Sequence, residues 1–414
     1  MSPNAPAFLQ AGKKERTMTN NFNQITPRRH TGSVKWDTIP DDVIPLWVAD
    51  MDFPAAPAIQ AALQRRLDHG IFGYTAVDDS YYDAIIRWQQ RRHQFAVQRD
   101  WILYTIGVVP AVSCALKALT LPGERVLVQT PVYNCFFSSI RNQGLEVVEN
   151  LLKRDGDSYV IDWDDFERQC SDEKVTIFLL CNPHNPAGRV WTREELERMG
   201  AICKRHGVRV VSDEIHCEII MPGYTFTPFA AVNEVNLKNS VTLCAPSKAF
   251  NIAGLQNAYL ICPDAEVRRR VDRVINIYEV CDVNPFGVEA LKAAYNDSEA
   301  WLDEMNQYIW ENYQFLKAYL LENLPQVSVC RLEGTYLAWL DIMAFECTSD
   351  EATDELLHQG KVFVSSGTLY GRRAGEGYLR LNLACPRETL HEGLRRLCRT
   401  LGQHIEDEEV SCPL

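Results

Sequence analysis

The chain has 414 residues, of which 46% are hydrophobic and 23% are charged, and its formal net charge at pH 7 is −13. This length predicts roughly two to three domains, and the balanced composition excludes a short peptide, a collagen-like chain and wholesale disorder. The negative net charge repels phosphate backbones and anionic lipid headgroups, so we expect neither nucleic acid nor a membrane as a partner.

The first 17 residues contain two prolines and a glycine and no continuous apolar stretch, so we expect no signal peptide. We interpret residues 1–30 as a mobile lead-in, in which Met18 is an alternative start. No apolar run reaches the ~20 residues that span a bilayer. The 14 cysteines are too sparse for a disulfide-stapled secreted domain, and none are spaced as CxxC. We therefore expect reduced thiols and a cytoplasmic location.

From residue 55 onward, helix and strand patterns alternate along the chain. Pro57 begins and Gly70 ends the first amphipathic helix, which is the usual placement of these two residues. Further helices are predicted over Tyr81–His93, from Gly107 to Ala118, and from the capping box of Thr192 and Glu195 to Gly207. The predicted strands are Trp101–Thr105, Arg125–Thr130, Leu145–Leu152, Val175–Cys181, Val208–Ser212, Val241–Cys244 and Ala258–Cys262.

Continuously apolar strands separated by helices indicate a mostly parallel sheet covered by helices on both faces. After Pro285 the pattern changes to long helices over about 288–322, followed by separated strands such as Tyr336–Asp341 and Tyr378–Ala384. We predict an α/β fold with a smaller α+β domain. Its parts are an N-terminal segment 31–54 that joins the small domain, a large domain 55–287, a small domain 288–404 and an acidic tail 405–414.

Polar residues and a glycine follow four of the predicted strands. Asn185 lies in the turn CNPHNPAG, Asp213 follows VRVVS, Lys248 follows VTLCAPS, and Gly107 follows Trp101–Thr105. Ligands of open parallel sheets bind at the carboxyl ends of the strands, so we expect these residues to meet in one crevice. A lysine, a carboxylate, an amide and a glycine before a helix suit a phosphorylated, nitrogen-containing aromatic cofactor.

Each group has a separate chemical reason. The Lys248 amine is suited to forming a Schiff base with an aldehyde. The Asp213 carboxylate is suited to keeping a pyridine nitrogen protonated, which makes the ring an electron sink. The backbone N–H groups at Gly107, Val108 and Val109 begin a helix and are suited to holding a phosphate.

These residues also carry a resemblance. The motifs NPHNPAG, SDEIH and APSKAFNIAGLQ, in this order, resemble the fold-type I enzymes that use pyridoxal 5′-phosphate (PLP), which have the aspartate aminotransferase-like fold. The motifs PLWVADMDF, FGYT, TPVYNCFF and YLRLNLACP resemble the MalY/PatB group of cystathionine β-lyases, also called C–S lyases. The resemblance extends from about Asn23 to the region of His404.

The resemblance implies a role for each residue around the cofactor ring. Lys248 is the implied Schiff-base lysine, and Asp213 is the implied partner of the ring nitrogen. Asn185 is expected to donate to the ring hydroxyl, with His216 near the same group. Tyr133 is expected to stack on the ring and is a candidate catalytic residue.

The resemblance also implies contacts beyond the ring. Ser247 is expected on the phosphate, and Tyr74 is expected to reach the phosphate of a second copy across a homodimer interface. Arg380 is expected to bind the substrate α-carboxylate through two parallel hydrogen bonds, with Ala49 and Asn185 beside it.

Two positions depart from the usual transaminase pattern. Ala245 and Gln256 stand where many transaminases have a serine and an arginine on the phosphate. The phosphate must therefore be held by Ser247, the helix start at Gly107, and Tyr74. The C–S lyase group shares the glutamine, so this departure favours a lyase over an ordinary transaminase.

We therefore expect a lyase that releases a thiol, pyruvate and ammonia from L-cystathionine or related cysteine S-conjugates by α,β-elimination. An aminotransferase is the second interpretation, and a regulatory or binding protein with a PLP-enzyme fold is the third. For single residues a structural role is the alternative: Arg380 alternates with leucines as on a half-buried strand, and Tyr74 and Tyr133 flank turns where aromatic residues often only pack. The nine histidines form no ligand-spaced set, so no metal site is predicted.

Overall fold

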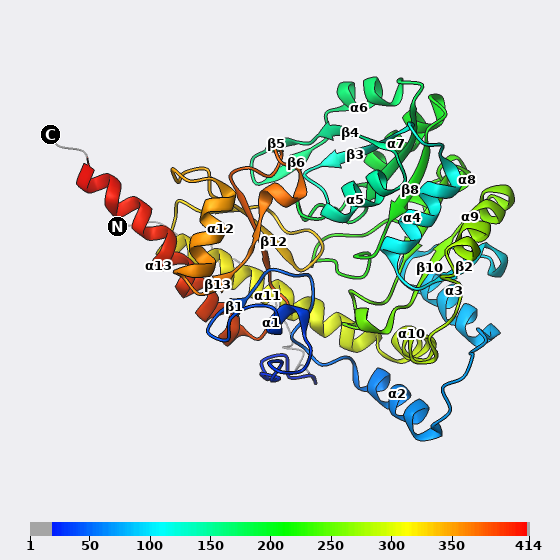
Figure 1. Ribbon diagram of the computed structural model, residues 1–414, viewed down its shortest axis with the longest axis horizontal. Coiled ribbons are helices and arrows are strands. Elements are labelled where there is room, and N and C mark those ends of the chain that lie inside the picture. Colours follow the sequence, from blue (N-terminus) through cyan, green and yellow to red (C-terminus); the bar gives the residue numbers. More distant parts are fainter. Residues whose placement is uncertain (1–18, 412–414) are drawn as a thin grey trace, which may run out of the picture.

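The computed structural model describes residues 19–411, with side chains described for 19–404. Met18 and the side chains of the predicted acidic tail lie outside the described residues. The larger part of the molecule, on the right in Figure 1, is a seven-stranded sheet with helices on both faces. None of the described helices combines the length and the apolar character that a membrane crossing requires.

The large sheet is mostly parallel, as the sequence predicts. Its strands, in spatial order, are β2 (Ile102–Thr105), β10 (Ala258–Ile261), β9 (Ser240–Cys244), β8 (Arg209–Asp213), β7 (Val175–Cys181), β3 (Arg125–Thr130) and β4 (Glu146–Leu151). Only β10 runs against its two neighbours, while the pairs from β9 to β4 are all parallel. The carboxyl ends of β2, β7, β8 and β9 therefore share one edge.

Burial on both faces explains why these strands are continuously apolar. In β7, Ile177 and Leu179 pack into one core cluster, whereas Phe178 and Leu180 pack into a second cluster on the other face. The first cluster includes side chains of α4, α5 and α9, and the second includes side chains of α6 and α7. The fold-class prediction is therefore confirmed.

Four helices of this part begin and end close to the predicted positions, namely α2 (Pro57–His69), α3 (Asp79–His93), α4 (Val108–Leu119) and α7 (Arg193–Arg205). The part also contains α5 (Asn134–Asn142), α6 (Trp163–Cys170), α8 (Glu234–Lys238), α9 (Ala265–Ile277) and α10 (Pro285–Asp297). The capping box of α7 is formed: the Thr192 hydroxyl accepts from the Glu195 N–H at 3.1 Å, and the Glu195 carboxylate accepts from the Thr192 N–H at 2.9 Å.

A second, four-stranded sheet lies beside the large one. It consists of β11 (Ser328–Val329), β12 (Leu337–Asp341), β15 (Tyr378–Asn382) and β14 (Ser365–Ser366), and it packs with α11 (Glu299–Asn323), α12 (Ser349–His358) and α13 (Arg387–Ser411). The remaining short elements are α1 (Val34–Asp37), the pair β1 (Ile44–Pro45) and β13 (Val362–Phe363), the hairpin β5 (Lys153–Asp155) and β6 (Ser158–Val160), and four 3₁₀ helices.

The predicted helical stretch 288–322 is divided at Ser298. The Ser298 hydroxyl donates to the carbonyl of Ala293, and a new helix, α11, begins at Glu299. Helix α10 packs against α2 and α3, next to the large sheet, whereas α11 runs beneath the small sheet. A continuous helical pattern in the sequence does not reveal such a break, because both helices supply apolar faces.

Residues 19–30, predicted as part of a mobile lead-in, are packed on the small sheet's side of the molecule. Phe22 is buried and contacts the rings of Phe53 and Trp301. The Glu304 carboxylate accepts hydrogen bonds from the backbone N–H groups of Thr19 and Asn20. The prediction is wrong for these residues, because their contacts include Trp301 and Glu304, about 280 residues away in the chain, which leave no local pattern.

Candidate active site

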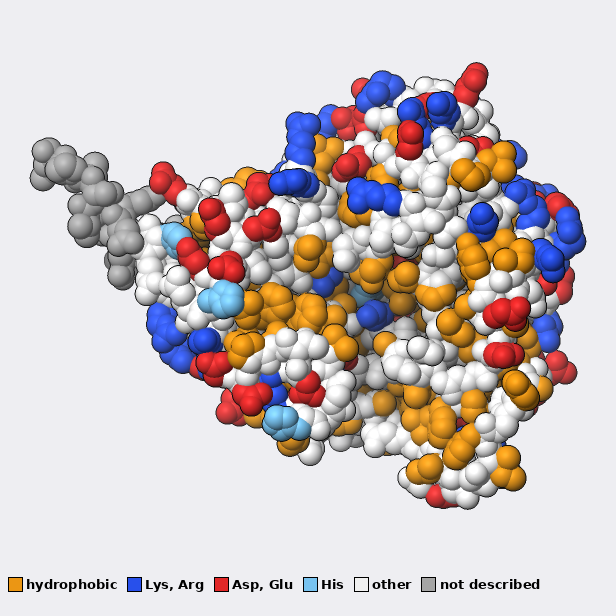
Figure 2. Space-filling model, viewed as in Figure 1, with side chains coloured by type: hydrophobic (Ala, Val, Ile, Leu, Met, Phe, Trp, Pro, Cys, Tyr) orange, Lys and Arg blue, Asp and Glu red, His pale blue; other side chains and the backbone are white. Residues whose placement is uncertain are grey.

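A cavity of about 390 Å³ lies at the carboxyl ends of β7, β8 and β9. All the predicted site residues except Tyr74 line it, namely Ala49, Gly107, Val108, Val109, Tyr133, Asn185, Asp213, His216, Ser247, Lys248 and Arg380. Figure 2 shows a hollow on this face with basic and histidine side chains at its floor and hydrophobic side chains around it. The expectation that strand ends bring these residues together is met.

Lys248 follows β9 and is half-buried. Its Nζ donates to the Ala49 carbonyl at 2.6 Å. Burial lowers the pKa of the Lys248 amine, the Arg380 charge lowers it further, and the Asp50 carboxylate acts in the opposite direction. A lysine with a lowered pKa in a cavity has the property required of a nucleophile or a general base.

Asp213 is the last residue of β8 and is buried. Burial raises the pKa of its carboxyl group to about 7, although the Ile215 N–H and the Lys248 charge favour the ionised form. The carboxylate accepts from the Ile215 N–H at 3.1 Å and has no described cation hydrogen-bonded to it. A cationic ring nitrogen opposite this group would compensate its burial.

His216 lies three residues further on and is also buried. Burial, together with the charges of Lys248 and Arg380, lowers the pKa of its ring to about 3, so the imidazole is neutral at pH 7. Its Nδ1 is buried with no hydrogen-bond partner among the described residues. The ring is therefore available to a polar group of a ligand.

Arg380 lies on β15 of the small sheet and is buried. Its Nη1 donates to the Asn185 side-chain oxygen at 3.2 Å, and its Nη2 donates to the Trp47 carbonyl at 2.9 Å. The guanidinium lies over the Tyr370 ring, with 4.6 Å between its carbon and the ring centroid. Its Nε is buried with no partner among the described residues, so a cation without a carboxylate partner faces the cavity.

The opposite part of the cavity contains a helix start. Gly107 precedes α4, whose first N–H groups have no acceptor within the helix. Ser247 and Gln256 line the same cavity, and Ala245 is buried. The concave surface here offers backbone donors and a hydroxyl but no arginine, as the sequence indicates.

Tyr133 and Tyr74 occupy very different places. Tyr133 lines the cavity directly before α5, and burial raises the pKa of its hydroxyl well above the usual range. Tyr74 is 101% exposed and makes no part of the cavity of its own chain. Its expected position at the site of a second copy therefore stays a prediction.

Three residues that line the cavity are not predicted as site residues from the sequence. Trp47 supplies a carbonyl to Arg380, Tyr370 supplies a ring beneath it, and Cys135 stands beside Tyr133 at the start of α5. Trp47 belongs to the motif PLWVADMDF, which signals the region but not the contact. Tyr370 ends the 3₁₀ helix Gly367–Tyr370, directly after β14, and has no sequence signal of its own.

A cluster of three titratable side chains lies in the core, outside the cavity. A His93 ring nitrogen, the Cys217 sulfur and a Glu218 carboxylate oxygen all lie within 4.8 Å of one another. However, Glu218 already accepts from the Trp88 indole N–H at 2.6 Å, and the Arg92 guanidinium is 3.6 Å from its second oxygen. We interpret this group as a buried ion-pair network, since the guanidinium opposes a metal cation.

The cavity fits the cofactor that the sequence resemblance implies. It contains a lysine amine, a buried carboxylate whose pKa is raised, a neutral histidine with an unpartnered nitrogen, and a helix start with free donors. These four groups match an aldehyde, a pyridine nitrogen, a ring hydroxyl and a phosphate, respectively. Arg380 remains for a substrate carboxylate.

Residues 41–397 match the family described as aminotransferase class I and II. The chain belongs to this family. Cystathionine β-lyase PatB of Bacillus subtilis (strain 168) is 44% identical over 388 residues, which cover 92% of this chain and 100% of that protein. Protein MalY of Escherichia coli (strain K12) is 32% identical, with coverage of 92% and 98%.

Solved structures agree with this assignment to the aminotransferase class I and II family. Cystalysin of Treponema denticola, which contains PLP, is 34% identical with a TM-score of 0.90, and the match covers 93% of this chain and all of that one. The PLP-bound C–S lyase of Staphylococcus hominis is 30% identical with a TM-score of 0.87 and the same coverage. The resemblance to the MalY/PatB group and to the PLP-enzyme fold is thereby confirmed.

Proposed function

We propose that this protein is a PLP-dependent carbon–sulfur β-lyase that cleaves L-cystathionine or related cysteine S-conjugates to a thiol, pyruvate and ammonia. The observation that carries the proposal is the convergence of Lys248, Asp213 and Arg380 on one cavity of about 390 Å³. The similarity to cystathionine β-lyase PatB and to the C–S lyase of Staphylococcus hominis supports this reaction over others of the same fold.

PLP, when bound, supplies an aldehyde for the amine and a cationic ring that withdraws electrons from the substrate Cα. Asp213 would keep the ring nitrogen protonated, because a buried carboxylate without another hydrogen-bonded cation favours that charge. Asn185 and His216 would hold the ring hydroxyl, and Tyr133 would hold the ring. The N–H groups of Gly107, Val108 and Val109 would hold the phosphate, together with the Ser247 hydroxyl.

The Lys248 amine is the group that removes the proton from the substrate Cα. Burial lowers its pKa below that of an ordinary lysine, which favours the neutral amine that takes the proton from the substrate Cα as a general base. Arg380 binds the substrate α-carboxylate, with Ala49 and Asn185 beside it. Loss of the sulfur from Cβ then requires a proton for the thiolate, which the Lys248 ammonium or the Tyr133 hydroxyl supplies.

The active protein is proposed to be a homodimer with shared sites. Tyr74 would contact the phosphate in the second copy, and its complete exposure in the single chain agrees with such a role. We also propose a division into a large domain that begins at residue 55 and a small domain that ends at residue 404 and contributes Arg380. Because α10 packs against α2 and α3, the boundary is placed at Ser298 and not at 288 as the sequence predicts. The free cysteines of the described residues are typical of a reducing compartment, which supports a cytoplasmic enzyme.

The test is incubation of the PLP-loaded protein with L-cystathionine in the absence of any keto acid. We expect thiol and pyruvate in equal amounts, and loss of both in the Lys248→Ala variant with an unchanged oligomeric state. Conversion that depends on an added keto acid would instead identify an aminotransferase, which shares the ring contacts. Absence of any reaction with cystathionine and with S-alkyl cysteines would leave only a binding or regulatory role.

A further inference from the structure

The chain between Trp47 and Phe53, here called the 47–53 segment, passes between the two parts of the active site. It precedes the large sheet in the sequence, yet its backbone contacts both Lys248, which follows β9, and Arg380, which lies on β15. A single short segment therefore touches the two cationic side chains to which the proposed function gives the main roles.

Two carbonyl groups of the segment face the cavity. The Ala49 carbonyl accepts from Lys248 Nζ at 2.6 Å, and the Trp47 carbonyl accepts from Arg380 Nη2 at 2.9 Å. Both acceptors are backbone atoms, so no side-chain rotation can move them. Their positions depend on how firmly the 47–53 segment itself is held.

The carbonyl groups of Val48 and Asp50, which alternate with those of Trp47 and Ala49, both accept from the buried side chain of Asn382. The Asn382 amide donates to the Val48 carbonyl at 2.7 Å and to the Asp50 carbonyl at 2.8 Å. Its side-chain oxygen accepts from the Ala384 N–H at 2.8 Å, which fixes the orientation of the amide. Asn382 is fully buried and lies two residues after Arg380 on β15. The nitrogen and the oxygen of this amide are thus both hydrogen-bonded, the nitrogen to the 47–53 segment and the oxygen to the residue that follows next but one in its own chain.

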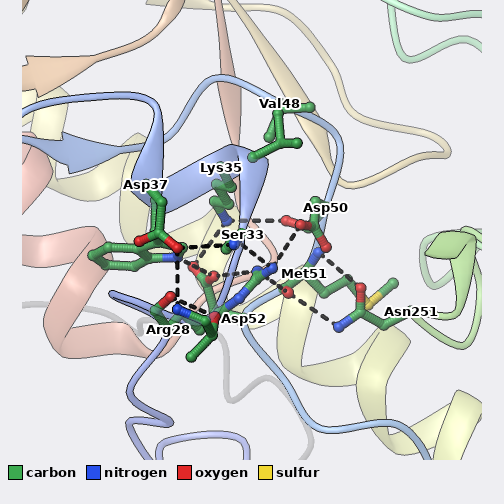
Figure 3. Close-up of polar contacts among 12 residues, drawn as sticks. Arg28, Ser33, Lys35, Asp37, Val48, Asp50, Met51, Asp52 and Asn251 are labelled. Carbon is green, nitrogen blue, oxygen red and sulfur yellow. Dashed lines mark hydrogen bonds and ion pairs between the residues drawn. The ribbon is translucent and has the colours of Figure 1, made fainter.

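The far end of the segment is held by different groups. Asn251, three residues after Lys248, donates to the carbonyls of Met51 and Phe53 and accepts from the Met51 N–H. On the other side, Arg28 pairs with the Asp50 carboxylate at 2.8 Å (Figure 3). Within the stretch from Trp47 to Asp50, the Ser365 hydroxyl also donates to the Trp47 carbonyl at 3.0 Å, and Lys35 Nζ donates to the Asp50 carbonyl at 2.9 Å. Asn382 differs from both because its amide bridges two carbonyls, one on each side of Ala49.

We propose that Asn382 is a positioning residue for the active site, which acts through the Val48 and Asp50 carbonyls to aim those of Trp47 and Ala49 at Arg380 and Lys248. The inference rests on the proposed function, since it concerns the two side chains that bind and deprotonate the substrate. Without the amide, the carbonyls of Val48 and Asp50 lose the donor that links them, and the Trp47 carbonyl is held, among the described side chains, only by Ser365 and Arg380. The backbone around Ala49 then moves, which displaces the acceptors that orient Arg380 and Lys248.

The test replaces Asn382 with leucine, which has a similar shape and cannot donate. The PLP-loaded variant is titrated with L-alanine, which has the α-amino and α-carboxylate groups but no β-leaving group, and binding is followed by visible absorption. We expect Kd to rise about tenfold, because small displacements of positioning groups are costly. Hydrogen exchange of peptides that cover the 47–53 segment should become faster, with and without the cofactor.

Asn312 provides a matched control. Its buried amide also donates to two carbonyls, those of Leu383 and Cys385, and its oxygen accepts from Arg387 Nε, but it makes no hydrogen bond with the 47–53 segment. Asn312→Leu should lower the thermal midpoint as Asn382→Leu does, while the Kd of L-alanine and the exchange of the segment stay at wild-type values. Should Asn382→Leu not fold, Asn382→Asp serves instead, because it keeps the acceptor for the Ala384 N–H and removes both donors.

An unchanged Kd in the Asn382 variants would overturn the inference, as would an equal rise in Asn312→Leu. Failure of the proposed function has a different signature. A wild-type protein that binds L-alanine but releases no thiol from any cysteine conjugate would contradict the lyase, while the comparison of the variants would still decide the role of Asn382.

Discussion

At the residue scale, the ionisation of Asp213 couples the site to the stability of the chain. The pKa of this carboxyl is about 7 in the fold, against an ordinary value of 3.8. A raised pKa means that the folded state favours the protonated form. Its contribution to stability is therefore complete below about pH 4 and is lost as the pH rises through 7. A difference of about three units corresponds to roughly 4 kcal/mol at most.

We predict that Asp213→Asn stabilises the cofactor-free protein relative to wild type, and increasingly so between pH 5 and pH 8. Urea denaturation midpoints at several pH values measure this. Glu392 is the control of opposite sign, because hydrogen bonds from Arg395 and Arg396 lower its pKa to about 2. The difference between Glu392→Gln and wild type should stay constant over this range and change only below pH 4.5. A pH-independent effect of Asp213→Asn would contradict the prediction.

At the element scale, a buried ionic cluster joins the N-terminal segment to the rest of the structure (Figure 3). Lys35 is completely buried and pairs with Asp52 at 2.8 Å, while the other Asp52 oxygen accepts from Arg28 and from the Trp36 indole. Removing one partner of a buried pair leaves an uncompensated charge, which is far more costly than losing an exposed pair. The cluster therefore fixes the chain that leads into the active site.

We predict that Asp52→Ala lowers the free energy of unfolding by about 3 to 5 kcal/mol, because Lys35 and Arg28 lose their shared acceptor. The control is Lys238→Ala, which removes an exposed i,i+4 pair with Glu234 and should cost less than about 1 kcal/mol. Urea denaturation of both variants gives the comparison. Equal losses of unfolding free energy in the two variants would show that the buried cluster stabilises the fold no more than an exposed ion pair does.

Helix α7 offers a second test at this scale. A Cβ added to Gly200 would lie 2.0 Å from the side-chain oxygen of Asn236. Asn236 is buried, and its side-chain nitrogen donates to the Leu196 carbonyl, which holds the side chain in place. Gly200→Ala should therefore destabilise the protein by about 1 to 3 kcal/mol, despite the higher helix propensity of alanine. Gly402 of α13 has open space at the same atom, so Gly402→Ala should be neutral or stabilising by up to about 1 kcal/mol. We expect the thermal midpoint to fall in Gly200→Ala and to stay the same or rise in Gly402→Ala, each relative to wild type.

Local sequence patterns determine which elements could be predicted. Strands β3 and β7 match their predicted residues, because a run of apolar residues bounded by prolines or polar turns has few alternatives. The break at Ser298 and the packing of residues 19–30 could not be predicted, since both depend on partners distant in the chain. The roles of Lys35 and Asp52 are hidden for the same reason: only the fold buries them.

At the scale of the whole molecule, the topology of the parallel sheet made most of the site predictable. Asp213 ends β8, whereas Asn185 and Lys248 follow β7 and β9, and the rule that carboxyl ends meet at one edge brings the three together. Contacts made through the backbone could not be predicted in this way. The carbonyls of Trp47 and Ala49 contact Arg380 and Lys248, but a carbonyl group has no identity in the sequence.

The proposed dimer leads to a prediction that concerns the assembly and no single chain. If Tyr74 serves the site of the other copy, a dimer of one Tyr74→Ala chain and one Lys248→Ala chain contains one intact site, because the intact Lys248 and the intact Tyr74 then meet. Coexpression of the two inactive variants should restore about a quarter of wild-type thiol release, since half of the dimers are mixed and each has one working site of two. The control is coexpression of Lys248→Ala with Asp213→Asn, whose defects lie within a chain's own site, so that every site stays impaired. Recovery in both mixtures, or in neither, would contradict the contribution of Tyr74 across the interface.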